Sequence, residues 1–188
     1  MVSPTIPCRL STACAARLVG RLVGAIIDAV DSNSAPVIRA AKGTDADVLS
    51  ALALRSKAFW GYSPEFMAAC RGELSYDSHQ IAAKEFYFAV CQVSEHLVGF
   101  YAIEHLADDQ FELCGLFVEP QYIGRGYGRL LVENAKHKAS ELGAACLIVQ
   151  GDPNAEDFYA AAGGVRTGER ESGSVPGRFL PLFRIDLT

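Results

Sequence analysis

The residues with the clearest chemical meaning form a glycine-rich turn between Glu119 and Arg129. Glycines at positions 124, 126 and 128 let the backbone turn tightly and approach a ligand without Cβ clashes. A strand is expected before the turn and a helix after it, so backbone N–H groups and the positive end of the helix dipole would converge there. Arg125 and Arg129 add positive charge nearby. The turn is therefore suited to bind a phosphate or pyrophosphate.

The glycine spacing excludes two common phosphate-binding loops. A G-x-G-x-x-G dinucleotide loop needs a glycine where this chain has Arg129, and no G-K-[ST] follows as in a Walker loop. The strand before the turn is expected to belong to an antiparallel meander, which also argues against a doubly wound dinucleotide fold. A glycine-rich turn can be purely structural, so the turn alone does not identify a function.

The elements that must position this turn begin at Pro36. The pattern predicts a first strand at 37–40, a helix with a wide apolar stripe over 44–60, and a second helix from Ser63-Pro64 to about Arg71. Three runs rich in aromatic and β-branched residues then predict an antiparallel meander, at 85–93, 97–104 and 111–118. After the turn we expect a helix of about four turns, followed by a buried strand at 145–149 and a short helix at 154–162. Two final strands are expected at 165–169 and 179–187.

Two motifs carry a family resemblance. Gln121-x-x-Gly124-x-Gly126 resembles the Q/R-x-x-G-x-G/A signature of the GNAT superfamily of acyl-CoA-dependent N-acyltransferases. Asn154, Phe158-Tyr159 and Gly163 resemble the family's N-x-x-x-F-Y-x-x-x-G segment. The resemblance covers about residues 36–188 and implies an α+β fold of three layers, with a mixed, mostly antiparallel sheet flanked by helices. It predicts an acyltransferase domain over 36–188, preceded by an extension over 1–35.

The resemblance also implies a binding site for coenzyme A, with acetyl-CoA as co-substrate and no metal. The backbone of the turn would hold the pyrophosphate, through Ile123, Gly124, Arg125, Gly126, Gly128 and Arg129. The pantetheine arm would pair like an extra strand beside Phe117 and Val118, where a backbone N–H would polarise the thioester carbonyl. Asn154 would hydrogen-bond the pantetheine, and capping of the following helix is an equal explanation.

The catalytic groups implied by the resemblance are a tyrosine acid and a carboxylate base. Tyr159 matches the general acid that protonates the departing thiolate, with a core tyrosine as the structural alternative. An amine with a pKa of about 10.4 must lose a proton before it attacks, and a carboxylate acting through water can accept it. Glu112 and Glu104 are the candidates, and a solvated strand carboxylate is the alternative for each.

Strand alternation decides which side chains accompany Glu112. Without a bulge, Glu112, Cys114 and Leu116 share one face of the fourth strand, and Leu113 and Phe117 share the other.

The acceptor site should lie between the first two helices and the meander. Phe59-Trp60-Gly61-Tyr62 falls in that connection, where the rings could shape a pocket, favour a cationic amine or simply pack the helices. The S-K-x-x-W-G-Y stretch and the segment Ser174–Arg178 resemble a subgroup of bacterial GNAT proteins, which does not supply a substrate.

Composition limits the setting. The chain has 188 residues, a net charge of −5 and six cysteines. The acidic balance argues against a general nucleic-acid binder, and the longest apolar run of the extension, at 22–27, is too short to span a membrane. The extension is predicted to hold a short amphipathic helix and a polar linker. The cysteines form no CxxC pair, so we expect free thiols in a cytoplasmic protein.

The sequence leaves several functions to compare. The lead prediction is an acetyl-CoA-dependent N-acetyltransferase acting on a primary amine of a small molecule or peptide, by direct attack in a ternary complex. A covalent route through Cys114 or Cys146 lacks an identifiable histidine–carboxylate partner. The alternatives are a non-catalytic acyl-CoA-binding sensor on the same fold and a nucleotide-dependent enzyme. A homodimer remains open as the assembly.

Overall fold

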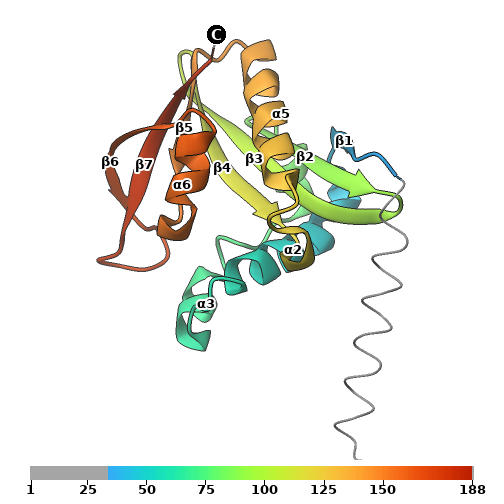
Figure 1. Ribbon diagram of the computed structural model, residues 1–188, viewed down its shortest axis with the longest axis horizontal. Coiled ribbons are helices and arrows are strands. Elements are labelled where there is room, and N and C mark those ends of the chain that lie inside the picture. Colours follow the sequence, from blue (N-terminus) through green and yellow to red (C-terminus); the bar gives the residue numbers. More distant parts are fainter. Residues whose placement is uncertain (1–33, 188) are drawn as a thin grey trace, which may run out of the picture. The chain divides into compact units, whose positions relative to one another are not determined.

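A seven-stranded sheet in the order β1-β2-β3-β4-β5-β7-β6 organises the protein (Figure 1). The computed structural model describes residues 34–187, so the expected helix and linker of the extension lie almost entirely outside the described residues. All neighbouring strands are antiparallel except β4 and β5, which run parallel. The strands are β1 Val37–Ala40, β2 Phe86–Val93, β3 His96–Ala107, β4 Gln110–Val118, β5 Cys146–Gln150, β6 Val165–Glu171 and β7 Phe179–Asp186.

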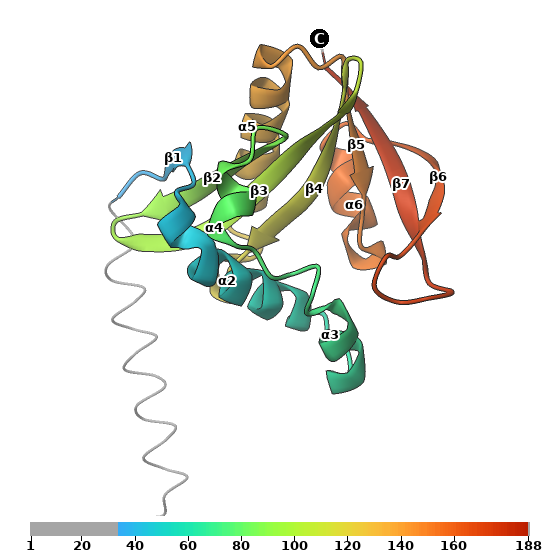
Figure 2. The same ribbon diagram turned by 180° about the vertical axis from the view of Figure 1, so that it is seen from behind.

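Helices cover both faces of the sheet (Figures 1 and 2). They are α2 Ala46–Ala58, α3 Pro64–Cys70, α4 Ser78–Ala82, α5 Tyr127–Glu141 and α6 Glu156–Ala161. Side chains of α5 and α6 pack into one core, which includes Leu131 and Tyr159. Side chains of α2, α3 and α4 pack into a second core on the other face, which includes Leu49 and Cys70. The expected three-layer α+β fold with a mostly antiparallel sheet is therefore confirmed.

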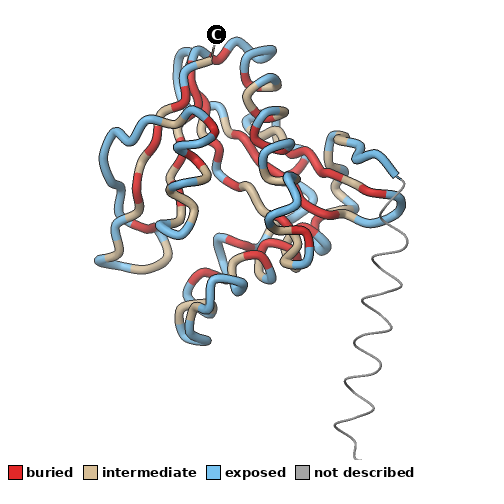
Figure 3. The backbone as a smooth tube through the Cα atoms, viewed as in Figure 1, coloured by how far each residue is buried: buried red, intermediate tan, exposed pale blue. Residues whose placement is uncertain are grey.

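Buried positions concentrate in strands β2 to β5 and in β7, whereas β6 is exposed along its whole length (Figure 3). The second helix begins as predicted, because the Ser63 hydroxyl accepts from the Phe66 N–H at 3.2 Å and Pro64 takes the first helical position. The five-residue helix α4 was not predicted. It begins where the carboxylate of Asp77 accepts from the N–H groups of His79 and Gln80, and its length is too short for a periodic apolar pattern.

The feature that positions the site is the divergence of β4 from β5. The two strands pair only from Gln110 to Glu112 on β4 and from Cys146 to Ile148 on β5. Beyond Glu112, β4 continues along β3 alone, while β5 continues along β7 as far as Gln150. An opening thus lies between the carboxyl-terminal halves of the two parallel strands.

A bulge in β4 changes which side chains share a face. Ala102 pairs with Gly115 and Ile103 with Leu113, so Cys114 is the extra residue. Leu116 therefore packs in the same core as Leu113, and Phe117 packs in the opposite core. The expected faces were wrong beyond Cys114, because the extra residue reverses the alternation.

Candidate active site

A cavity of about 490 Å³ occupies the opening between β4 and β5. It receives residues from α2, β4, the glycine-rich turn, the end of β5 and α6. The cavity brings together ten of the residues predicted from the sequence, namely Glu112, Phe117, Val118, Ile123, Gly124, Gly126, Gly128, Arg129, Asn154 and Tyr159. Glu104 and Arg125 do not line it. The guanidinium of Arg125 lies over the ring of Tyr122, 5.6 Å from its centroid.

The glycine-rich turn presents bare backbone to this cavity. Gly124 and Gly126 have φ angles of +80° and +92°, and a Cβ at either position would meet no atom within 4 Å. Helix α5 begins directly after Gly126. Among the described residues, no backbone carbonyl accepts from the N–H groups of Tyr127, Gly128 and Arg129, as expected for a first helical turn. This arrangement fits a pyrophosphate.

Two of the predicted amide donors are engaged inside the turn. The N–H of Ile123 donates to the carbonyl of Pro120, and the N–H of Arg125 donates to the carbonyl of Tyr122, both at 3.3 Å. We therefore narrow the predicted phosphate contacts to the amides of the glycines and Arg129. The N–H of Tyr127 joins them, and the helix start at this residue is the signal that identifies it.

At the end of β4, a backbone N–H was expected to be free to polarise the thioester carbonyl. The N–H of Val118 donates to the hydroxyl of Ser56 on α2 at 3.3 Å, so this amide already has an acceptor. Ser56 is buried and lines the cavity. The sequence alone does not reveal this contact, because the two residues are 62 positions apart.

Tyr159 belongs both to the core and to the cavity. Its ring packs against Phe158 and Phe183, with centroids 5.1 and 5.9 Å away. Burial, and then the negative charge of Asp152, raise the pKa of Tyr159 above its ordinary value. The phenol therefore keeps its proton at neutral pH and is available as a donor at the cavity wall.

The two candidate bases face each other across β3 and β4. Glu104 and Glu112 are register partners. The carboxylate of Glu112 lines the cavity and is bound by Arg170 at 2.9 Å. Burial, and then the charge of Glu112, raise the pKa of Glu104. Only Glu112 reaches the cavity directly.

The two cysteines considered for covalent catalysis are unsuited to it. Cys114 lines the cavity and its thiol donates to the carbonyl of Ala102 at 3.3 Å. Desolvation by the surrounding protein, and then the negative charges of Glu104 and Glu112, raise the pKa of this thiol to about 12. A protonated thiol is a weak nucleophile. Cys146 is fully buried in β5.

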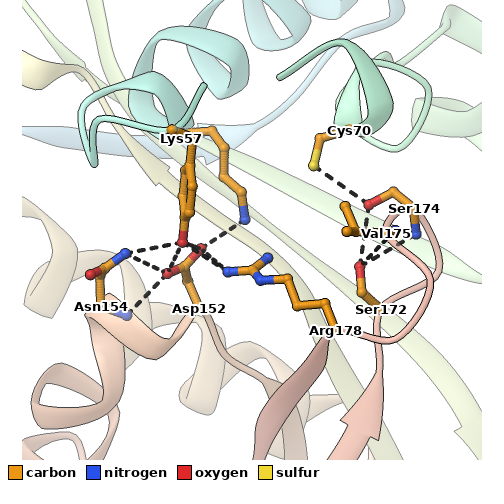
Figure 4. A network of polar contacts seen from close by, with 9 residues as sticks. Lys57, Cys70, Asp152, Asn154, Ser172, Ser174, Val175 and Arg178 are labelled. Atoms are coloured by element: carbon orange, nitrogen blue, oxygen red, sulfur yellow. Dashed lines mark hydrogen bonds and ion pairs between the residues drawn. The ribbon is translucent and has the colours of Figure 1, made fainter. Parts of the chain in front are cut away.

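A polar network missed by sequence reasoning lies at the end of β5 (Figure 4). The carboxylate of Asp152 accepts from Lys57 and from the hydroxyl of Tyr62, both at 2.8 Å. The hydroxyl of Tyr62 accepts from Asn154 at 3.0 Å and from Arg178 at 2.8 Å. Burial raises the pKa of Asp152, but its bonds with Lys57 and its other donors outweigh that effect and leave the pKa below its ordinary value.

This network bears on two alternatives left by the sequence. Asp152 caps the one-turn helix Pro153–Ala155, and the following helix α6 has no side-chain cap, so Asn154 caps neither helix. The ring of Tyr62 stacks on Phe66 with centroids 4.1 Å apart. The charged groups of Lys57 and Arg178 also lie over the Tyr62 ring, at 5.5 and 5.2 Å. This ring is therefore occupied by the protein's own groups.

Comparison with known proteins identifies the fold and the family. The family described as the acetyltransferase (GNAT) domain matches residues 66–174, which is more than half of the chain. The chain belongs to the GNAT acetyltransferase family. The search of curated proteins gives no significant match.

This chain matches solved GNAT structures over nearly the whole length of each solved chain. A GCN5-related N-acetyltransferase from Rhodopseudomonas palustris is 25% identical, with a TM-score of 0.67, over 82% of this chain and 97% of its own. The PaiA N-acetyltransferase from Thermoplasma acidophilum, solved with coenzyme A, is 18% identical, with a TM-score of 0.65, over 81% and 99%. The ribosomal-protein-S18-alanine N-acetyltransferase from Escherichia coli is 18% identical, with a TM-score of 0.61, over 82% and 95%.

Within residues 34–187 the GNAT domain offers no grouping of three or more histidine, cysteine or acidic side chains that could hold a metal ion. No helix in that range is long and apolar enough to cross a membrane.

Proposed function

We propose that this GNAT protein is an acetyl-CoA-dependent N-acetyltransferase that acetylates a primary amine by direct attack. One observation carries the proposal: a single cavity joins the bare start of α5 to Tyr159 and Glu112. A structure that only bound an acyl-CoA would need the first of these features and not the other two. The CoA-bound relative from Thermoplasma acidophilum supports the choice of cofactor.

The turn would bind the pyrophosphate through its free amides, and the helix dipole would add to that attraction. Phe117 and Val118 would flank the pantetheine arm along the unpaired half of β4. The hydroxyl of Ser56, which accepts from the Val118 N–H and belongs to a residue that lines the cavity, would donate to the thioester carbonyl. These contacts would hold the thioester in the opening between the strands.

Glu112 would take the proton of the acceptor ammonium through a water molecule. Glu104 is the register partner of Glu112 on the neighbouring strand β3. The neutral amine then forms a C–N bond to the acetyl carbon as the C–S bond breaks. Tyr159 donates its hydrogen bond, and then its proton, to the departing sulfur. The proton released from the amine nitrogen during the attack returns through solvent to the phenolate of Tyr159. Glu112 releases the proton that it took from the ammonium to solvent, so both groups are regenerated.

Conservative substitutions test these roles. Tyr159→Phe and Glu112→Gln should each lower kcat for amine-dependent CoA release by about 100-fold, because each removes one proton transfer. Tyr87→Phe and Glu133→Gln are matched controls outside the cavity and should keep full activity. Because the pKa of Tyr159 is raised, wild-type kcat should not fall as pH approaches about 10, where an ordinary tyrosine loses its proton. Unchanged turnover in Tyr159→Phe would refute the acid assignment.

A further inference from the structure

We propose that the acceptor amine carries a carboxylate near its nitrogen, as an amino acid does, and that Lys57 binds this carboxylate beside the positive charge of Arg178. The inference rests on the proposed acetyltransferase function and names the substrate class of the same site. It comes from the polar network at the end of β5, in which Lys57 and Arg178 each keep N–H donors that have no acceptor among the described residues (Figure 4).

Lys57 is the first part of the argument. Its side chain is only 13% exposed and lines the cavity. Among the described residues, its ammonium makes one hydrogen bond, to the carboxylate of Asp152 at 2.8 Å. An ammonium has three N–H donors, so two make no hydrogen bond to the described residues. A largely buried donor without a partner is costly, and a bound anion would satisfy it.

Arg178 supplies the second cation from the segment between β6 and β7. Its side chain is 20% exposed, and its Nη2 donates to the hydroxyl of Tyr62 at 2.8 Å and lies 3.6 Å from Asp152. Its guanidinium lies over the ring of Phe66, 4.8 Å from the centroid. Within the described residues, its Nε and Nη1 donate to no acceptor. The guanidinium is thus held in place with donors to spare.

The charges of the network do not cancel. Asp152 is ionised at neutral pH because its donors keep its pKa low. Tyr62 is neutral, because burial and the nearby carboxylate raise its pKa to about 12. Two cations and one anion leave a net charge of about +1 in a partly buried position. One carboxylate balances that charge, whereas a dianionic phosphate would reverse it.

The rest of the cavity favours a zwitterionic ligand. The acidic side chain of Glu112 lies on β4, while Lys57 and Asp152 come from α2 and the end of β5. An amine placed toward Glu112 can therefore present its own carboxylate to Lys57. Beside the cavity, the rings of Tyr62 and Phe66 are already covered by Lys57 and Arg178, so these rings have little room for a second cation.

A panel of matched acceptors tests the proposal with the full-length protein. L-amino acids are assayed for CoA release beside their α-amides and their decarboxylated amines, with spermidine as a purely cationic acceptor. We expect kcat/KM for the preferred amino acid to exceed that of its amide by about tenfold or more. Lys57→Met should bring this ratio close to one, mainly through KM. Lys57→Arg should retain much of it, and Lys138→Met on the far end of α5 should leave it unchanged.

The outcomes separate this proposal from the proposed function. If amides, decarboxylated amines or spermidine are acetylated as well as the acids or better, the carboxylate proposal is wrong and acetyl transfer stands. An acid-to-amide ratio that Lys57→Met leaves unchanged overturns the assignment of Lys57. If Lys57→Met does not fold, the wild-type ratio and Lys57→Arg still decide the matter. If acetyl-CoA binds and no amine is acetylated, both proposals fall.

Discussion

Gly126 and Gly143 adopt the same left-handed backbone conformation at opposite ends of α5, each with a φ angle of +92°. Only Gly126 lines the cavity. Replacing either by alanine should cost about 1 kcal/mol of stability, because an L side chain is strained in this conformation and neither Cβ meets another atom. Gly126→Ala should in addition weaken acetyl-CoA binding by about tenfold, because the added Cβ would project where the backbone of the turn is expected to contact the pyrophosphate.

Calorimetric titration with acetyl-CoA, together with urea unfolding, measures both effects. The strain is shared by the two variants, so any difference in affinity reports the ligand contact alone. Equal acetyl-CoA affinity in Gly126→Ala and Gly143→Ala would contradict the assignment of this turn as the pyrophosphate site.

At the residue scale, most of the site residues predicted from the sequence line the cavity, but the sequence predicts little of the charge beside it. The glycines, Tyr159 and Glu112 are found from local motifs and strand patterns, because their neighbours in the chain fix their place. Asp152, Lys57 and Arg178 are not found, because the hydrogen bonds that tie them to α2 and to Tyr62 join positions that are 90 or more residues apart. No local pattern marks a side chain whose partner lies so far away in the sequence.

At the element scale, the Asp152 network ties three segments together. Lys57 and Tyr62 belong to α2 and the loop that follows it, Asp152 follows β5, and Arg178 precedes β7. The segment between β6 and β7 is held on its other side by Cys70 of α3, whose sulfur lies 3.5 Å from the hydroxyl of Ser174. The end of the cavity beside Lys57 and Asp152 is therefore held together by side-chain contacts.

Asp152→Asn tests that description through stability. The substitution leaves Lys57 and Arg178 close together without their carboxylate, and should lower the free energy of unfolding at pH 7 by about 2 kcal/mol. The folded-state pKa of Asp152 lies below the unfolded value, so its contribution is present above about pH 4 and is lost as pH falls through the folded-state value. The difference from wild type should therefore shrink in acid.

Urea unfolding at several pH values measures this effect. Asp186→Asn is the matched control, because its ion pair with Arg184 is 72% exposed at the carboxylate and should matter little. A difference between Asp152→Asn and wild type that stays constant down to pH 3 would contradict the ionic description of the network.

The order of the elements follows from the sequence more closely than their registers do. Strands, helices and the turn are placed within a few residues, because alternation, caps and glycines are local signals. The bulge at Cys114 was not placed, because an extra residue in β4 changes nothing in the local composition. Its consequence is large, since it puts Leu116 in the same core as Leu113 and Phe117 in the opposite core.

At the scale of the whole molecule, two cores on opposite faces support one divergent pair of strands. All residues that line the cavity lie between Ser56 and Leu180, within the folded unit that begins at Pro36. The residues proposed as acid, base and anion site come from α6, β4 and α5, so the proposed site exists only when the sheet is assembled. This explains why the family motifs can be read locally while the acceptor specificity cannot.

The central claim is that this cavity transfers an acetyl group to an amine. The most direct measurement incubates the full-length protein with acetyl-CoA and a mixture of amino acids, polyamines, aminoglycosides and peptides, and follows both CoA release and acetylated products by mass spectrometry. We predict one acetylated amine for each CoA released, and the loss of both in Tyr159→Phe. Tight binding of acetyl-CoA with no acetylated amine in any mixture would contradict the account and indicate a non-catalytic acyl-CoA sensor.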